Sequence, residues 1–198
     1  MLSWPNRITV LRLLMVTPFI ILLLNSSDSP AYRYGALGLV VLIGVGDAAD
    51  GIIARRTGKV TKIGSVLDPL ADKALMISAL LLLSTARVAP DPATRLPYWV
   101  SVTLVSRELF MLIGTAVVFV LAGIFQAVPS PAGKAATVGQ FVTIGLAIAL
   151  PDLNAWMPRA MPIAANVIWG VTVAMALLSW VGYIRMGSKL VASAGSGR

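Results

Sequence analysis

Six long apolar stretches follow one another along this chain, separated by short polar or proline-rich breaks. About 20 apolar residues are enough for a helix to cross the hydrocarbon core of a bilayer, and a chain in lipid must satisfy its backbone polar groups internally. We therefore predict an all-α membrane protein, a bundle of six transmembrane helices that forms a single domain over residues 1–198. The predicted spans are residues 9–24, 32–50, 64–86, 98–123, 135–150 and 160–184.

Composition supports this class. Charged residues make up only 12% of the chain and hydrophobic residues 58%, whereas a soluble domain carries about 25% charged residues. The formal net charge of +8 does not indicate a nucleic-acid partner, because the basic residues punctuate apolar stretches instead of forming a long polar surface. The expected partner is the lipid bilayer, whose anionic surface attracts such residues. Cysteine and histidine are absent, so any bound metal must be a hard ion with oxygen ligands.

The basic residues are distributed unequally between the two sides of the predicted bundle. Six spans place both termini on one side, and 11 of the 16 Lys and Arg residues fall there. They are Arg7, Arg12, Arg55, Arg56, Lys59, Lys62, Lys73, Lys134, Arg185, Lys189 and Arg198. The other side holds Arg33, Arg87, Arg95 and Arg159. Because loops rich in Lys and Arg stay in the cytoplasm, we expect a multi-pass protein of the cell (inner) membrane with cytoplasmic termini.

Four of the eight acidic residues lie within one short region, from Asp47 to Asp72. Asp47 and Asp50 are three apart and Asp68 and Asp72 are four apart, so each pair shares one face of a helix. The short basic connector makes the two helices antiparallel neighbours, which brings the four carboxylates together. Because such carboxylates repel strongly at low dielectric, we expect one or two divalent cations among them. Oxygen-only ligands favour magnesium, manganese or calcium.

Two further residues of this region favour a phosphate ligand. Gly51 allows close approach to the backbone, and the guanidinium of Arg55 can grip phosphate oxygens in a bidentate way. Together with a cation they indicate a diphosphate site, in which a carboxylate takes the proton from an attacking hydroxyl. Two other interpretations are open: acids solvated at the helix ends or paired with Arg55 and Arg56, and a divalent cation transporter. A transporter has no need for Gly51, Ala54 and Arg55 at these spacings.

One pattern in this region is similar to that of a known family. It runs from Asp47 to Asp72 and reads Asp-x2-Asp-Gly-x2-Ala-Arg-x8-Gly-x3-Asp-x3-Asp. This pattern resembles the signature of the CDP-alcohol phosphotransferases, and the six-stretch layout resembles the same family over nearly the whole chain. The resemblance implies a bundle of six transmembrane helices, usually a homodimer, with a polar active-site cavity that opens to the cytoplasm.

The resemblance also implies roles for the matching residues. Four aspartates would hold two metal ions, Mg2+ or Mn2+, and the last of them, Asp72, would be the general base. The four are Asp47, Asp50, Asp68 and Asp72. Two residues near the N-terminus match a segment that lines the nucleotide pocket. With these two included, the residues that would bind CDP-diacylglycerol are Gly51, Arg55, Thr61, Asn6 and Thr9.

Four shorter patterns are most similar to phosphatidylglycerophosphate synthases within this family. They are Asn6-x-x-Thr9-x-x-Arg12, Asp68-Pro-Leu-Ala-Asp-Lys73, Val105-Ser-Arg-Glu108 and Gly133-Lys134-x-x-Thr137-x-x-Gln140. These enzymes join CDP-diacylglycerol to glycerol 3-phosphate, giving phosphatidylglycerophosphate and CMP. A phosphorylated acceptor needs further cations, and we expect Arg107 and Lys134 to bind it. The alternatives are an internal pair or snorkelling for Arg107 and an ordinary loop charge for Lys134. Cardiolipin synthases of the same family, which use phosphatidylglycerol, share much of this pattern.

Overall fold

The computed structural model describes the backbone of residues 4–57, 64–122 and 131–195, and the side chains within 14–46, 73–114, 116–117 and 132–184. In these backbone ranges the regular elements are six α-helices and no strand. They are α1 (Trp4–Leu24), α2 (Pro30–Thr57), α3 (Gly64–Leu83), α4 (Tyr98–Ala122), α5 (Pro131–Trp156) and α6 (Ala160–Gly195). The prediction of an all-α chain is confirmed, and each helix contains or overlaps one of the six apolar stretches.

Some helix ends differ from the prediction. α3 ends at Leu83 instead of residue 86, because local hydrogen bonds satisfy the carbonyls of its last turn. The hydroxyl of Ser84 donates to the Leu80 carbonyl at 3.0 Å, and the backbone N–H of Leu96 donates to the Leu83 carbonyl at 3.2 Å. α5 continues beyond residue 150 to Trp156, with Pro151 inside the helix. Pro151 has no backbone N–H to donate to the preceding turn, but α5 nevertheless continues to Trp156.

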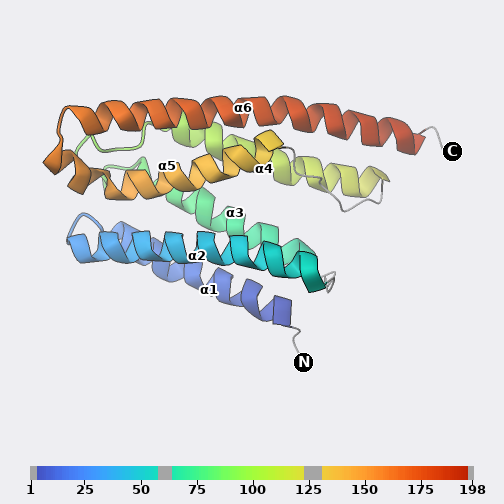
Figure 1. Ribbon diagram of the computed structural model, residues 1–198, viewed down its shortest axis with the longest axis horizontal. Coiled ribbons are helices and arrows are strands. Elements are labelled where there is room, and N and C mark those ends of the chain that lie inside the picture. Colours follow the sequence, from blue (N-terminus) through green and yellow to red (C-terminus); the bar gives the residue numbers. More distant parts are fainter. Residues whose placement is uncertain (1–3, 58–63, 123–130, 196–198) are drawn as a thin grey trace.

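Successive helices run in alternate directions, so the bundle has two distinct ends (Figure 1). The end that holds the start of α1 and the end of α6 is called the terminal end here. It also holds the end of α2, the start of α3, the end of α4 and the start of α5. The opposite end, called the loop end, holds the connections formed by residues 25–29, 84–97 and 157–159.

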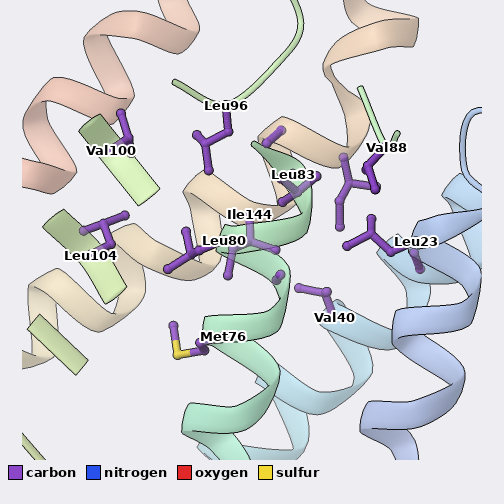
Figure 2. Packing of buried hydrophobic residues seen from close by; sticks show 14 of the residues in the cluster. Leu23, Val40, Met76, Leu80, Leu83, Val88, Leu96, Val100, Leu104 and Ile144 are labelled. Atoms are coloured by element: carbon purple, nitrogen blue, oxygen red, sulfur yellow. The ribbon is translucent and has the colours of Figure 1, made fainter. Parts of the chain in front are cut away.

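α3 lies in the middle of the bundle, where it packs against α1, α4 and α5. α6 packs on α4 and α5, and α2 packs on α1 and α5. The apolar core joins these helices through fully buried side chains such as Leu80 of α3, Leu104 of α4 and Ile144 of α5. Figure 2 shows the three side chains in one cluster. This packing holds α3 at a fixed place among its neighbours, and so determines where its polar first turns lie.

The outer surface of the bundle is apolar. Large hydrophobic side chains such as Val102 on α4 and Leu178 on α6 are exposed. Within the described residues two helical segments are long and apolar enough to cross a membrane, Ala132–Trp156 and Ala160–Ile184. Shorter apolar helical segments cover Leu14–Leu24, Pro30–Gly46 and Lys73–Leu83. A surface of this kind suits contact with lipid better than contact with water.

Small residues bring α5 and α6 close together. A Cβ atom added to Gly139 would lie 3.1 Å from Oγ1 and 3.2 Å from Cγ2 of Thr172. The hydroxyl of Thr143 donates to Thr172 Oγ1 at 3.1 Å, and the hydroxyl of Thr172 donates to the Gly139 carbonyl at 3.3 Å. Close backbone approach and interhelical hydrogen bonds of this kind are common between membrane helices.

A bidentate ion pair joins α2 to α5 at the loop end. Nε of Arg33 donates to Oδ2 of Asp152 at 3.0 Å, and Nη2 donates to Oδ1 at 2.5 Å. Arg95 donates to the carbonyls of Ala89 and Pro90, at 2.9 Å in each case. These arginines of the predicted non-cytoplasmic side therefore bind to the protein itself.

Candidate active site

The predicted metal ligands lie on two helices whose relevant ends share one end of the bundle. Asp47 and Asp50 belong to the second half of α2, and Asp68 and Asp72 belong to the first turns of α3. Figure 1 places both of these helix ends at the terminal end. The side chains of the four aspartates lie outside the described residues, so their convergence on a metal stays a prediction.

The predicted nucleotide-binding residues are placed only by their helices. Gly51 and Arg55 belong to α2, and Asn6 and Thr9 belong to the first turns of α1. Their side chains, like the whole of Thr61, lie outside the described residues. The start of α1 and the end of α2, the helix parts to which these four residues belong, both lie at the terminal end (Figure 1).

A buried group of polar side chains lies between α3, α4, α5 and α6. Its members share contact with Arg107 or with the neighbouring Glu108, and we call it the Arg107 cluster. It consists of Lys73, Arg107, Glu108, Thr137, Gln140 and Ser179, together with the backbone carbonyl of Gly133. Lys73 follows Asp72 directly in α3, so the cluster lies beside the turn of α3 that carries the predicted general base.

Every nitrogen of the Arg107 guanidinium donates to a protein oxygen. Nη1 donates to Oε1 of Glu108 at 2.6 Å and to Oε1 of Gln140 at 2.7 Å. Nε donates to Oγ of Ser179 at 3.2 Å, and Nη2 donates to the carbonyl of Gly133 at 2.9 Å. Arg107 is 0% exposed. The internal pair with Glu108, which the sequence left open, is therefore present, while phosphate binding by Arg107 stays a prediction.

Glu108 has a basic partner for each of its two carboxylate oxygens. Oε1 accepts from Arg107, and Oε2 pairs with Nζ of Lys73. The carboxylate is 0% exposed and the Lys73 side chain 15% exposed. Charges are stable in such surroundings only when they are paired. The cluster contains two cations and one carboxylate, so one positive charge has no counter-ion among the described members.

The amide of Gln140 has a defined orientation. A guanidinium has donors only, so the amide oxygen must face Arg107 and Nε2 must point away from it. Gln140 is 0% exposed, and within the described part of the chain Nε2 has no hydrogen-bond partner. A buried donor without a partner costs about 1–3 kcal/mol, so this position suits an oxygen atom of a water molecule or a ligand.

Lys134 lies at the rim of this cluster. Its side chain is exposed, and it follows Gly133, whose carbonyl accepts a hydrogen bond from Arg107. The described contacts include no ion pair of Lys134. An exposed cation next to a cluster whose described members carry one excess positive charge makes a suitable place for an anion.

Sequence reasoning chose Arg107 and Lys134 but gave no site role to Lys73, Glu108 or Gln140. A local signal existed for Gln140, because positions 133, 137 and 140 share one face of a helix, and all three contact Arg107. The pair of Lys73 and Glu108 had no local signal, because the two residues belong to different helices.

An all-α chain with an apolar outer surface and a charged, buried interior is a helical membrane protein with an internal polar site. This chain belongs to the CDP-alcohol phosphatidyltransferase family, whose model matches residues 2–185. The predicted enzyme class is therefore confirmed, and the family assignment favours an enzyme over a cation transporter.

Several curated proteins are similar to this chain over most of its length. A probable phosphatidylglycerophosphate synthase of Mycobacterium tuberculosis (strain H37Rv) is 33% identical over 90% of this chain and 78% of its own length. A CDP-diacylglycerol–glycerol-3-phosphate 3-phosphatidyltransferase of Aquifex aeolicus is 29% identical over 94% of this chain and 97% of its own length. A CMP-forming cardiolipin synthase of Streptomyces coelicolor is 29% identical, over 92% and 80% respectively.

Proposed function

We propose that this protein transfers the phosphatidyl group of CDP-diacylglycerol to glycerol 3-phosphate, forming phosphatidylglycerophosphate and CMP. The complete family pattern from Asp47 to Asp72 supports the donor half of this reaction. Relatives that carry this activity in their names support the acceptor. The observation that carries the acceptor assignment is the charge balance of the Arg107 cluster, in which two cations meet one carboxylate.

In this proposal the chain crosses the membrane six times and works as a homodimer, with its polar active-site cavity open to the cytoplasm. The alternating helices and the apolar outer surface support the crossings. The 11 basic residues of the terminal side support a cytoplasmic position for that end. The acyl chains of the donor then stay in the bilayer, while the water-soluble acceptor reaches the site from the cytoplasm.

The donor atoms on α2 and α3 suit a hard divalent cation. They are carboxylates, and the whole chain offers neither a thiol nor an imidazole. Asp47, Asp50, Asp68 and Asp72 would hold two ions of Mg2+ or Mn2+. When bound, these ions neutralise negative charge on the diphosphate and on the departing CMP.

Residues of α1 and α2 bind the nucleotide end of the donor in this proposal. Arg55 grips the diphosphate oxygens, and Gly51 lets them approach the backbone of α2. Asn6 and Thr9 line the nucleotide pocket from α1, and Thr61 adds a contact to the CDP moiety. A shared nucleotide pocket requires that α1 and α2 bring these residues to one end of the bundle. The start of α1 and the end of α2 both lie at the terminal end (Figure 1), which supports the proposal.

Asp72 acts as the general base. It takes the proton from the acceptor hydroxyl as that oxygen forms a bond to the phosphorus of the phosphatidyl group. The bond between this phosphorus and the bridging oxygen breaks, and CMP leaves with the bridging oxygen and the electron pair. General base catalysis of this kind contributes about 10²- to 10⁴-fold to the rate.

Arg107 and Lys134 bind the phosphate of glycerol 3-phosphate. Lys134 is exposed, and the described members of the buried cluster beside it are two cations and one carboxylate, a balance that suits an anionic phosphate. Arg107 is connected to the turn of α3 that carries Asp72, because Glu108 pairs with both Arg107 and Lys73.

An acceptor panel tests this function. Purified protein in lipid nanodiscs is supplied with CDP-diacylglycerol and Mg2+, together with glycerol 3-phosphate, phosphatidylglycerol, serine or inositol 1-phosphate. The lipid product is identified by mass spectrometry and CMP is quantified. We expect phosphatidylglycerophosphate and CMP with glycerol 3-phosphate only. Metal flux into liposomes without any CMP release would instead support a cation transporter.

A cardiolipin synthase is the second candidate, because the Streptomyces coelicolor relative covers 92% of this chain. Its acceptor, phosphatidylglycerol, is a lipid with a phosphodiester, which has one negative charge where glycerol 3-phosphate has two at neutral pH. The same panel separates the two candidates. Cardiolipin formed from phosphatidylglycerol, without product from glycerol 3-phosphate, would replace the proposed function.

A further inference from the structure

Among the side chains that the structure describes, Glu108 is the one anion of the Arg107 cluster, and it connects two helices. Its carboxylate accepts from Arg107 of its own helix, α4, at 2.6 Å and pairs with Lys73 of α3. Adjacent residues of a helix point in different directions. The long side chain of Arg107 must therefore turn toward Glu108 for the two charged groups to meet. The contacts with Ser179, Gln140 and Gly133 hold it there.

The ion pair is not needed to attach α3 to α4. The two helices are already joined nearer the loop end, where the hydroxyl of Ser101 donates to the Leu80 carbonyl at 2.8 Å and also contacts Ser84. The buried side chains of Leu80 and Leu104 add apolar contact. Buried ion pairs are often no more stabilising than apolar residues of the same size. Stability alone therefore explains the Glu108 pair poorly.

The pair of Glu108 and Lys73 lies next to the residue proposed as the general base. Lys73 directly follows Asp72, and the backbone of a helix relates consecutive residues rigidly, so a restraint on Lys73 also restrains Asp72. On the other side, the same carboxylate restrains the guanidinium of Arg107. One buried side chain thus connects the turn that carries the proposed base to a cation of the proposed acceptor site.

We propose that Glu108 is a positioning residue, which sets the distance between Asp72 and the acceptor phosphate by holding Lys73 and Arg107 at the same time. This inference rests on the proposed function. Reacting groups must be placed within a fraction of an ångström, and a displacement of about 1 Å can lower the rate about 100-fold. Glu108 does not touch the reacting atoms.

The test compares three variants of the full-length protein in nanodiscs. Glu108→Gln keeps the size of the side chain and removes its charge, and Glu108→Asp keeps the charge on a shorter side chain. Asp152→Asn is the matched control, because it breaks another interhelical arginine pair, at the loop end. For each variant we measure kcat, KM for glycerol 3-phosphate, KM for CDP-diacylglycerol and Tm.

We expect Glu108→Gln to raise KM for glycerol 3-phosphate about 10-fold and to lower kcat by at least about 10-fold, with KM for CDP-diacylglycerol changed less than about 2-fold. Glu108→Asp should recover part of both losses. Asp152→Asn should lower Tm without changing the ratio of the two KM values. A lower KM for glycerol 3-phosphate in Glu108→Gln would show that the carboxylate only competes with the anion, and equal changes in both KM values would show a structural role. Either result overturns the proposal.

A charge-balanced variant covers the case in which Glu108→Gln does not fold. Lys73→Met combined with Glu108→Gln keeps the net charge of the cluster, and it should fold while showing the same rise in KM for glycerol 3-phosphate. A folded double variant with kinetics of the wild type would overturn the proposal. If the wild type makes no phosphatidylglycerophosphate, the proposed function fails first, and the same variants then test Glu108 with the acceptor that is used.

Discussion

Glu108 of α4 is paired inside the bundle with Lys73 of α3, and Lys73 directly follows Asp72 in the chain. This contact links the turn of α3 that carries the proposed base to a buried cluster whose described members are two cations and one carboxylate.

Asp72→Asn should abolish turnover and leave binding intact. The amide has nearly the size of the carboxylate but cannot accept the proton, so kcat should fall by about 10³-fold. CMP release measures kcat, and Mg2+-dependent binding of CDP-diacylglycerol measures the ground state. Asp28→Asn, at an exposed acid of the loop end, is the control and should keep full activity. Full activity in Asp72→Asn would remove this residue from the role of base.

Lys134→Ala and Arg107→Ala should behave differently, because one side chain is exposed and the other is fully buried. Lys134→Ala should raise KM for glycerol 3-phosphate about 10-fold with an unchanged Tm, since it removes one contact to the phosphate. Arg87→Ala, at an exposed cation of the loop end, is its control. An equal rise of KM for CDP-diacylglycerol in Lys134→Ala would contradict the acceptor assignment.

Arg107→Ala should affect both binding and folding. It leaves Glu108 with one partner fewer and Gln140 without its donor, so the free energy of unfolding should fall by about 3–5 kcal/mol. Thermal unfolding in detergent measures this loss. KM for glycerol 3-phosphate should also rise more than KM for CDP-diacylglycerol. A stable variant with unchanged kinetics would show that Arg107 has neither role.

Two substitutions of Gln140 separate its acceptor atom from its donor atom. Gln140→Glu keeps an oxygen for Arg107, removes the unpartnered donor and cancels the excess positive charge, so it should keep Tm and raise KM for glycerol 3-phosphate. Gln140→Leu removes the bond to the guanidinium, which should lower the free energy of unfolding by about 1.5–3 kcal/mol. If Gln140→Glu binds glycerol 3-phosphate as tightly as the wild type, the excess charge does not serve the acceptor.

Gly139→Ala should weaken the packing of α5 on α6. The new methyl group would meet Thr172 at 3.1–3.2 Å, and overpacking of this kind destabilises by about 1–3 kcal/mol. Gly38→Ala is the matched control, because no atom lies within 4 Å of the added Cβ atom, and alanine is the better helix former. Thermal unfolding measures Tm for both variants, and we expect a lower Tm only for Gly139→Ala. An unchanged Tm for Gly139→Ala would mean that the helices separate at little cost.

The sequence by itself determined the fold class, and it predicts the chemistry of the donor half. Long apolar stretches can only be helices in lipid, and the six helices follow from them with errors confined to helix ends such as Leu83 and Trp156. Helical spacing and the absence of imidazole and thiol groups likewise predict an oxygen-ligand metal site at Asp47 to Asp72. These conclusions depend on local patterns, which is why no tertiary information was needed.

Only the tertiary structure decided the partners of Arg107. The sequence offered both an acceptor phosphate and Glu108 as partners, and it placed Gln140 on one helix face with positions 133 and 137. It held no sign that Lys73 and Ser179 would contact the same group of residues. These side chains come from four helices, and their contacts depend on how α3 to α6 rotate and pack. A pairing between distant residues is set by that packing, because the apolar core determines where each helix lies and therefore which charged groups are within reach of one another.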